Sequence, residues 1–241
     1  MEAKAPSYDF IESVRAPARG GATARVVDAL REAIVSLELA PGTLIDKTAL
    51  CERLGVSRYP ISEALGRLQA EGLVEIQPQK GTIVSRIRFA DVHENMFVRR
   101  SLEKEAVREL ATRMKAETLS ALERNLRYQT AAIEVNDERG FHKLDLEFHE
   151  TLLSALGYPK VKAAAESARM GLDRVRRLLA SPERHARTRT EHVRILEALA
   201  ARDGERASQA MADHLDAVMV RLVSLATKRP ELFADRGDWQ S

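Results

Sequence analysis

One stretch decides the fold of the N-terminal part of the chain: Gly55-Val-Ser-Arg-Tyr-Pro-Ile-Ser-Glu-Ala-Leu-Gly-Arg-Leu68. Ser57 can cap a helix, and Pro60 then falls in its first turn, where a missing N–H breaks no intrahelical bond. The apolar residues recur at helical spacing: Ile61, Leu65 and Leu68. We therefore predict a helix that buries this face. Its other arc is polar and consists of Arg58, Tyr59, Ser62 and Gly66.

A shorter helix is predicted just before this one, over residues 46–54, and it ends at Gly55. Two short helices joined by a tight turn, the second with an exposed polar arc, are what entry into a DNA major groove requires. On these residues alone, an ordinary corner between two helices is an equally good interpretation.

The residues that follow favour the DNA-binding interpretation. Leu73-Val-Glu-Ile76 and Thr82-Ile-Val-Ser85 are predicted strands, and Gln77-Pro-Gln-Lys-Gly81 is the turn between them. An amphipathic helix precedes both short helices and ends at Ala40-Pro-Gly42. Three helices and a hairpin in this order form a winged helix-turn-helix. The candidate DNA contacts are Arg58, Tyr59 and Ser62 on the helix and Lys80 and Gly81 at the hairpin tip.

These residues resemble the GntR family of bacterial transcription regulators. The family's order and spacing are found in Leu39-Ala-Pro-Gly-Thr-Leu44, Leu54-Gly-Val-Ser-Arg58, Pro60-Ile61, Glu63-Ala-Leu65, Arg67-Leu68 and Glu71-Gly-Leu-Val74. Tyr59 stands where the family usually has Thr, and Ser62 where it usually has Arg. A guanidinium contact to guanine discriminates by about 1–3 kcal/mol, and Ser62 cannot make it. The family's operator sequence is therefore not transferred to this chain.

Composition limits the remaining classes. Lys and Arg number 38 against 36 Asp and Glu, so DNA binding must depend on local placement of cations rather than on a basic domain. The single cysteine, Cys51, excludes an internal disulfide. No signal peptide or membrane-spanning run is found, so we expect a cytoplasmic protein with no membrane partner.

The chain divides into five predicted segments. They are a flexible N-terminal tail (1–22), the winged helix-turn-helix (23–86), a hinge (87–91), a helical domain for effector binding and dimerisation (92–228) and a C-terminal tail (229–241). The helical domain is predicted as a six-helix bundle, with helices at 91–114, 117–135, 138–156, 160–179, 183–202 and 205–226. The fold class is thus mostly α.

The helical domain carries an unusual set of polar residues. Asp145 and His149 lie four residues apart on one predicted helix, and His192 and His214 lie on two later ones. Three imidazoles and a carboxylate from three helices can hold a metal ion in a bundle, and they suit zinc, with nickel or a similar ion as the alternative. Structural histidines in a metal-free dimeric DNA-binding protein explain the same residues. His142 shares their face but lies too far from His149 to join them.

This part of the chain resembles the FCD effector-binding domain of the FadR subfamily of GntR regulators. The resemblance rests on Asp145-Leu-Glu-Phe-His149, Glu191-His-Val-Arg-Ile195, His214-Leu215 and Arg99-Arg-Ser-Leu-Glu103. It implies Asp145, His149, His192 and His214 as metal ligands and Arg99 as a residue facing the effector cavity. Six helices rather than seven would indicate the VanR-like branch.

The expected function is that of a homodimeric regulator of a double-stranded DNA operator, controlled by a small carboxylate bound at the metal pocket, and the regulator is expected to be a repressor. A metal-dependent hydrolase is the alternative from another class, because a mononuclear site with open positions can activate water. The chain lacks a His-Glu-x-x-His pattern, however, and spacing assigns no other base. We therefore do not predict an enzyme, and we identify no catalytic residue.

Overall fold

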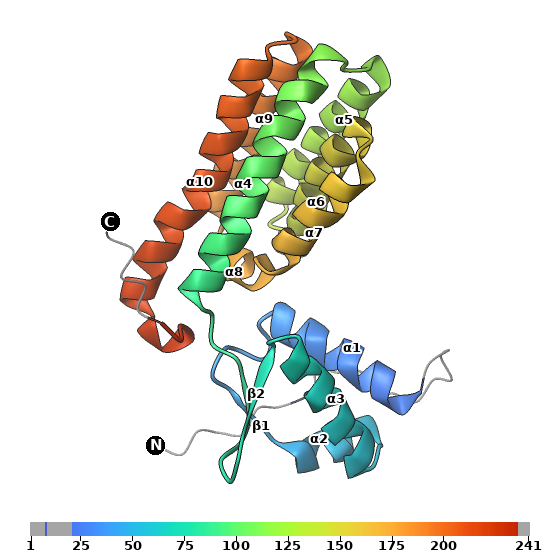
Figure 1. The fold of residues 1–241 in the computed structure, drawn as a ribbon, viewed down its shortest axis with the longest axis vertical. Coiled ribbons are helices and arrows are strands. Elements are labelled where there is room, and N and C mark those ends of the chain that lie inside the picture. Colours follow the sequence, from blue (N-terminus) through green and yellow to red (C-terminus); the bar gives the residue numbers. More distant parts are fainter. Residues whose placement is uncertain (1–7, 9–20, 236–241) are drawn as a thin grey trace. The chain divides into compact units, whose positions relative to one another are not determined.

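The computed structural model describes Tyr8 and residues 21–235 (Figure 1). The chain forms two compact units, one of Met1–Phe89 with Lys228–Ser241 and one of Ala90–Thr227. Most of the predicted N-terminal tail lies outside the described residues. Tyr8, Gly21 and Ala22 are described. Ala22 is the first residue of a helix, and the buried Tyr8 accepts a hydrogen bond on its hydroxyl from the Asp46 amide at 2.8 Å.

The first unit contains the predicted winged helix-turn-helix. Its elements are α1 (Ala22–Val35), β1 (Leu44–Ile45), α2 (Lys47–Leu54), α3 (Arg58–Ala70), β2 (Val74–Gln77) and β3 (Gly81–Val84). The strands form an antiparallel sheet in the order β1-β3-β2, so the short strand β1 joins the predicted hairpin. The apolar faces of α1, α2 and α3 meet in one core, in which Ile61, Leu65 and Leu68 are fully buried.

The ends of α2 and α3 show how the turn between them forms. Asp46 caps α2, because its carboxylate accepts from the amides of Thr48 and Ala49. Gly55 ends that helix with a φ of 66°, a left-handed conformation that favours glycine. Ser57 is the N-cap residue of α3, as predicted, but its side chain does not make the expected hydrogen bond to an amide of the first turn.

The second unit is entirely helical within the described residues. It consists of α4 (Phe89–Thr112), α5 (Ala116–Glu134), α6 (Glu138–Leu156), α7 (Pro159–Met170), α8 (Asp173–Leu178), α9 (Pro182–Ala200) and α10 (Gly204–Lys228). The single helix predicted over 160–179 is in fact two helices. The chain breaks at Gly171, a poor helix former, and the next residue, Leu172, turns fully into the core.

The described part of the predicted C-terminal tail is packed against the predicted hinge. After the short helix η1 (Pro230–Leu232), Phe233 forms a parallel β-bridge with Ile87. The Ile87 amide donates to Leu232 O, and the Ala234 amide donates to Ile87 O, each at 2.9 Å. We call residues 229–235 the C-terminal strap. Phe89 and Phe233 stack with their ring centroids 5.0 Å apart, so the C-terminal strap covers apolar side chains of the predicted hinge.

None of the helices in the described ranges is long and apolar enough to cross a membrane.

Candidate metal centre

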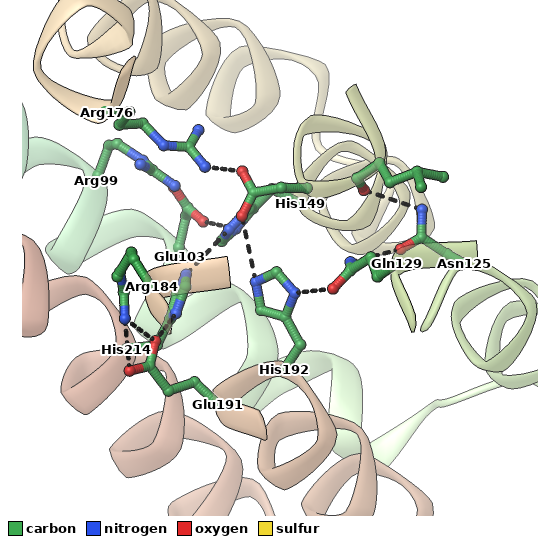
Figure 2. A network of polar contacts seen from close by, with 12 residues as sticks. Arg99, Glu103, Asn125, Gln129, His149, Arg176, Arg184, Glu191, His192 and His214 are labelled. Carbon is green, nitrogen blue, oxygen red and sulfur yellow. Dashed lines mark hydrogen bonds and ion pairs between the residues drawn. The ribbon is translucent and has the colours of Figure 1, made fainter. Parts of the chain in front are cut away.

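The four predicted ligands meet in the interior of the helical unit (Figure 2). Asp145 and His149 lie one turn apart on α6, and α9 and α10 contribute His192 and His214. None of the four is more than 4% exposed. One ligand atom from each lies within 4.8 Å of the others, which is the geometry of a mononuclear site. His142 is not part of this cluster, as expected.

Each of the three imidazoles has its Nδ1 atom engaged away from the cluster. His149 Nδ1 lies 2.6 Å from Glu103 Oε2, and His214 Nδ1 lies 2.8 Å from Glu191 Oε2. His192 Nδ1 lies 3.1 Å from Gln129 Oε1. Since all three partners are acceptors, each Nδ1 must carry the proton, and each Nε2 presents a lone pair to the centre. This tautomer is the one that a metal requires.

The acceptors behind the histidines are themselves held by further partners. Arg99 Nε donates to Glu103 at 2.6 Å, and Arg184 Nη1 donates to both oxygens of Glu191 at 2.8 and 3.0 Å. Gln129 donates to Asn125 at 2.8 Å. Two charged relays and one neutral relay therefore fix the orientation of the three rings.

Burial sets the charge of the ligands. It lowers the pKa of His149, His192 and His214, so these rings stay neutral and available for coordination. Burial also acts to raise the pKa of Glu103, but the positive charge of Arg99 and the hydrogen bonds that His149 and Arg99 donate to the carboxylate outweigh it. The net pKa of Glu103 lies well below its ordinary value, and its carboxylate is ionised.

Several polar atoms at the centre lack a hydrogen bond. His149 Nε2 and His214 Nε2 face each other at 3.3 Å, although both carry lone pairs once Nδ1 is protonated. His192 Nε2 and both carboxylate oxygens of Asp145 are buried with no hydrogen-bond partner among the described residues, although Asp145 forms an ion pair with Arg176. An unsatisfied buried polar group costs about 1–3 kcal/mol. A cation among these atoms removes that cost, so the donor set fits a borderline divalent metal.

Sequence reasoning missed the groups behind the ligands and the cation beside them: Glu103, Gln129, Arg176, Arg184 and Glu191. Glu103 and Glu191 stand inside the quoted motifs, and Glu103 lies four residues after Arg99, so helical spacing pairs these two side chains. No sequence signal indicates Arg176, because its position beside Asp145 depends on the break between α7 and α8.

The predicted DNA-contacting residues are all exposed in the first unit. Arg58, Tyr59 and Ser62 lie on the first two turns of α3, with Tyr59 76% exposed, while the neighbouring Ile61 is buried. Lys80 and Gly81 are exposed where β2 turns into β3. The arc of α3 that carries the polar residues is thus open to a partner.

Two family models match the chain, one within each of the two compact units. Bacterial regulatory proteins of the gntR family match residues 22–84, and the FCD domain matches residues 94–217.

Individual relatives agree with these models. The HTH-type transcriptional repressor RspR of Escherichia coli (strain K12) is 31% identical over 86% of this chain and 91% of its own length. An HTH-type transcriptional regulator of Streptomyces ambofaciens is 34% identical over 85% of this chain and 86% of its own. The crystal structure of a GntR regulator from Rhodococcus sp. RHA1 superposes with a TM-score of 0.68 at 26% identity, over 84% of this chain and 97% of that one. The chain therefore belongs to the GntR family of bacterial transcription regulators, with an FCD domain as its helical part, and it is a DNA-binding regulator rather than an enzyme.

Proposed function

We propose that this regulator holds a divalent metal ion in its FCD domain and binds a small organic acid beside it, and that the acid changes the affinity of the protein for its operator. The observation that carries the proposal is the convergence of Asp145 with three Nε2 atoms whose Nδ1 atoms are all committed elsewhere. This orientation brings three buried Nε2 lone pairs together without a donor between them, which favours a site that binds a cation.

Asp145, His149, His192 and His214 would hold the ion. Three neutral imidazoles and one carboxylate favour zinc, and nickel or a similar ion is the alternative. When bound, such an ion would supply Lewis-acid positions for an oxygen of the effector. Arg99 is fully buried, and one of its Nη atoms has no partner among the described residues, so it is the group we assign to the acid.

For the DNA-binding unit we propose contacts by Arg58, Tyr59, Ser62, Lys80 and Gly81, whose exposure supports this role. A homodimer on a near-palindromic operator doubles the small phosphate footprint of one chain. The protein would act as a repressor in the cytoplasm, where its operator lies. We assign the protein to the FadR subfamily. The VanR-like branch was favoured by a count of six helices, and that count no longer holds because α7 and α8 are separate helices.

Metal content tests the first part of the proposal. Protein purified without a histidine tag should contain about one equivalent of zinc or nickel, and the His149→Ala and His192→Ala variants should lose it while still binding DNA. A wild-type protein that contains no metal, and takes up none on reconstitution, would instead support a metal-free dimer with structural histidines.

Operator binding tests the second part. We expect Arg58→Ala to bind the duplex selected by the wild-type protein from a random pool at least about tenfold more weakly, since one charged hydrogen bond contributes about 1.5–3 kcal/mol. Arg124→Ala is the charge-matched control, because Arg124 is exposed on α5. Equal losses for the two variants would contradict a direct role for Arg58.

A further inference from the structure

Three arginines surround the candidate metal centre, and they come from three helices. Arg99 lies on α4, Arg169 near the end of α7 and Arg176 on α8. Figure 2 shows Arg99 and Arg176 on the same side of His149. The sequence patterns indicated only Arg99.

Each of these guanidinium groups keeps a buried nitrogen that no acceptor among the described residues satisfies. These atoms are Nη2 of Arg99 and Nη1 of Arg169 and Arg176. The remaining contacts of the three groups are already accounted for. Each group has one carboxylate partner: Arg99 donates to Glu103, Arg176 pairs with Asp145, and Arg169 forms an ion pair with Asp173 at 3.6 Å. The charges are therefore paired, but each group keeps one buried donor nitrogen that its carboxylate partner does not satisfy.

The donors are directed toward the metal ligands. Arg176 contacts the ligand Asp145, and Arg99 reaches the ligand His149 through Glu103. Arg169 and His149 line the same cavity of about 260 Å³ between α6 and α7.

The acidic residues of this cavity do not compete for the arginines. Glu147 pairs with Lys143 at 3.9 Å, and Glu150 and Glu166 both pair with Lys162, at 2.9 and 3.6 Å. The cavity volume lies just below the roughly 300–1,000 Å³ typical of drug-sized ligands. It suits a compact metabolite.

We propose that the effector carries two acidic groups. This inference rests on the proposed function, which places one acid group beside the metal ligands and Arg99. A carboxylate has two oxygens, so an acid with one oxygen on the metal has one left for a guanidinium. The three unsatisfied guanidinium nitrogens outnumber the oxygens that this one carboxylate leaves free, so a second anionic group is favoured, and Arg169 and Arg176 are the groups that bind it. The second group is a carboxylate or a phosphate on a small organic acid.

Matched pairs of acids test the proposal by calorimetry on the zinc-loaded, full-length protein. Malate is compared with 2-hydroxybutyrate, which has the same carbon count, and phosphoglycolate is compared with glycolate. We expect at least one dianion to bind about 10- to 100-fold more tightly than its partner, the gain expected for one charged hydrogen bond. The pair that shows the preference identifies the second group as carboxylate or phosphate.

Variants then assign the preference to residues. Arg169→Ala should lower the affinity for the preferred dianion to that for its monoanionic partner, and it should leave the affinity for the monoanion unchanged. Arg169→Gln gives the same readout if the alanine variant does not fold. Arg187→Ala is the control, because Arg187 is exposed on α9. The zinc content of each variant is measured in parallel.

The two proposals fail in different ways. If dianions and monoanions bind equally, and zinc removal abolishes both, the dianion proposal is overturned while the metal-and-acid function stands. A preference that survives Arg169→Ala and Arg169→Gln also overturns it. If no acid binds with or without zinc, both proposals are wrong.

Discussion

Glu103 is the carboxylate that orients His149, one of the proposed metal ligands. It accepts from His149 Nδ1 and is held by Arg99, so it fixes both the tautomer and the orientation of the ring. Glu103→Gln keeps the size of the side chain and removes its charge. We expect zinc affinity to fall by about 10- to 100-fold, the usual cost of losing a group that hydrogen-bonds a ligand, measured by competition with a chromophoric chelator.

Glu105→Gln is the matched control on the same helix, because Glu105 is exposed and pairs with Arg108 at the surface. The control should bind zinc like the wild type. If Glu103→Gln does so as well, the relay has no role in coordination.

His142 allows burial to be tested on a histidine outside the cluster. Burial, followed by the charges of Arg176, Arg177 and Arg169, lowers its pKa to about 3. In the unfolded chain its pKa is about 6.5. Above that pH both states are neutral, and as the pH falls below it the unfolded chain takes up a proton that the folded chain refuses. The contribution of His142 to stability is therefore lost between about pH 6.5 and 3.

We expect urea unfolding of the zinc-free protein to show this loss. Between pH 7 and 5 the wild type should lose more unfolding free energy than His142→Gln, and the two should respond alike between pH 8 and 7. Parallel behaviour over the whole range would mean that His142 is protonated as easily in the folded chain as in the unfolded one.

At the scale of elements, two glycines in the DNA-binding unit give opposite expectations for the same substitution. A Cβ atom at Gly55 or at Gly66 would meet nothing within 4 Å, so only the backbone decides the outcome. Gly55 has a φ of 66°, where a side chain costs about 1–2 kcal/mol. Gly66 lies inside α3, where alanine is better than glycine by about 0.5–1 kcal/mol.

Chemical denaturation of the two variants checks this pair. Gly55→Ala should be less stable than the wild type, and Gly66→Ala should be more stable. Two shifts of the same sign would show that packing, not backbone conformation, decides these positions.

The elements that the sequence predicted are those with a local cause. Periodic apolar residues and turn residues predicted α1, α2, α3 and the hairpin, and the structure confirms them. The two-residue strand β1 has no pattern of its own and forms only because β3 lies beside it. The break at Gly171 was missed, because one glycine within an otherwise helical pattern is often tolerated.

The same distinction holds for the site. Helical spacing singled out the four proposed ligands, the motifs of the resembled family supported them, and the structure brings them together. The groups behind them were missed because they are distant in sequence. Glu103 lies 46 residues from His149, Gln129 lies 63 from His192, and Glu191 lies 23 from His214. Such pairs arise from helix packing, which no local pattern records.

On the scale of the whole molecule, two segments of the chain connect the two units, and the C-terminal strap follows the second of them. The chain leaves the first unit at Phe89 and returns to it at Lys228, and the bridge between Ile87 and Phe233 fastens the two passages together. One passage begins α4, which carries Arg99, and the other ends α10, which carries His214. The polypeptide therefore joins α4 directly to the hinge and α10 directly to the C-terminal strap, so the backbone connects a change in either helix to these two segments.

We expect a chain that ends at Lys228 to keep its metal and to lose stability in the DNA-binding unit. Ile87 and Phe89 are 5% and 3% exposed, and burying such a side chain contributes about 1.5–3 kcal/mol. The truncated chain should also show a weaker effect of the acid on operator binding. A chain that ends at Asp235 is the control and should resemble the wild type in unfolding and operator assays. Equal behaviour of both shortened chains would show that the strap has no role.

The strap also restricts how such a regulator can acquire a new sensor. Residues 229–235 cover Ile87 and Phe89, so a foreign domain appended after residue 89 would leave these side chains without that cover. To keep the cover, the foreign domain would replace residues 90–227 as an insertion whose own ends lie close enough together for residues 229–235 to reach Ile87. A sensor that begins and ends at neighbouring points would therefore preserve the complete DNA-binding unit of this chain.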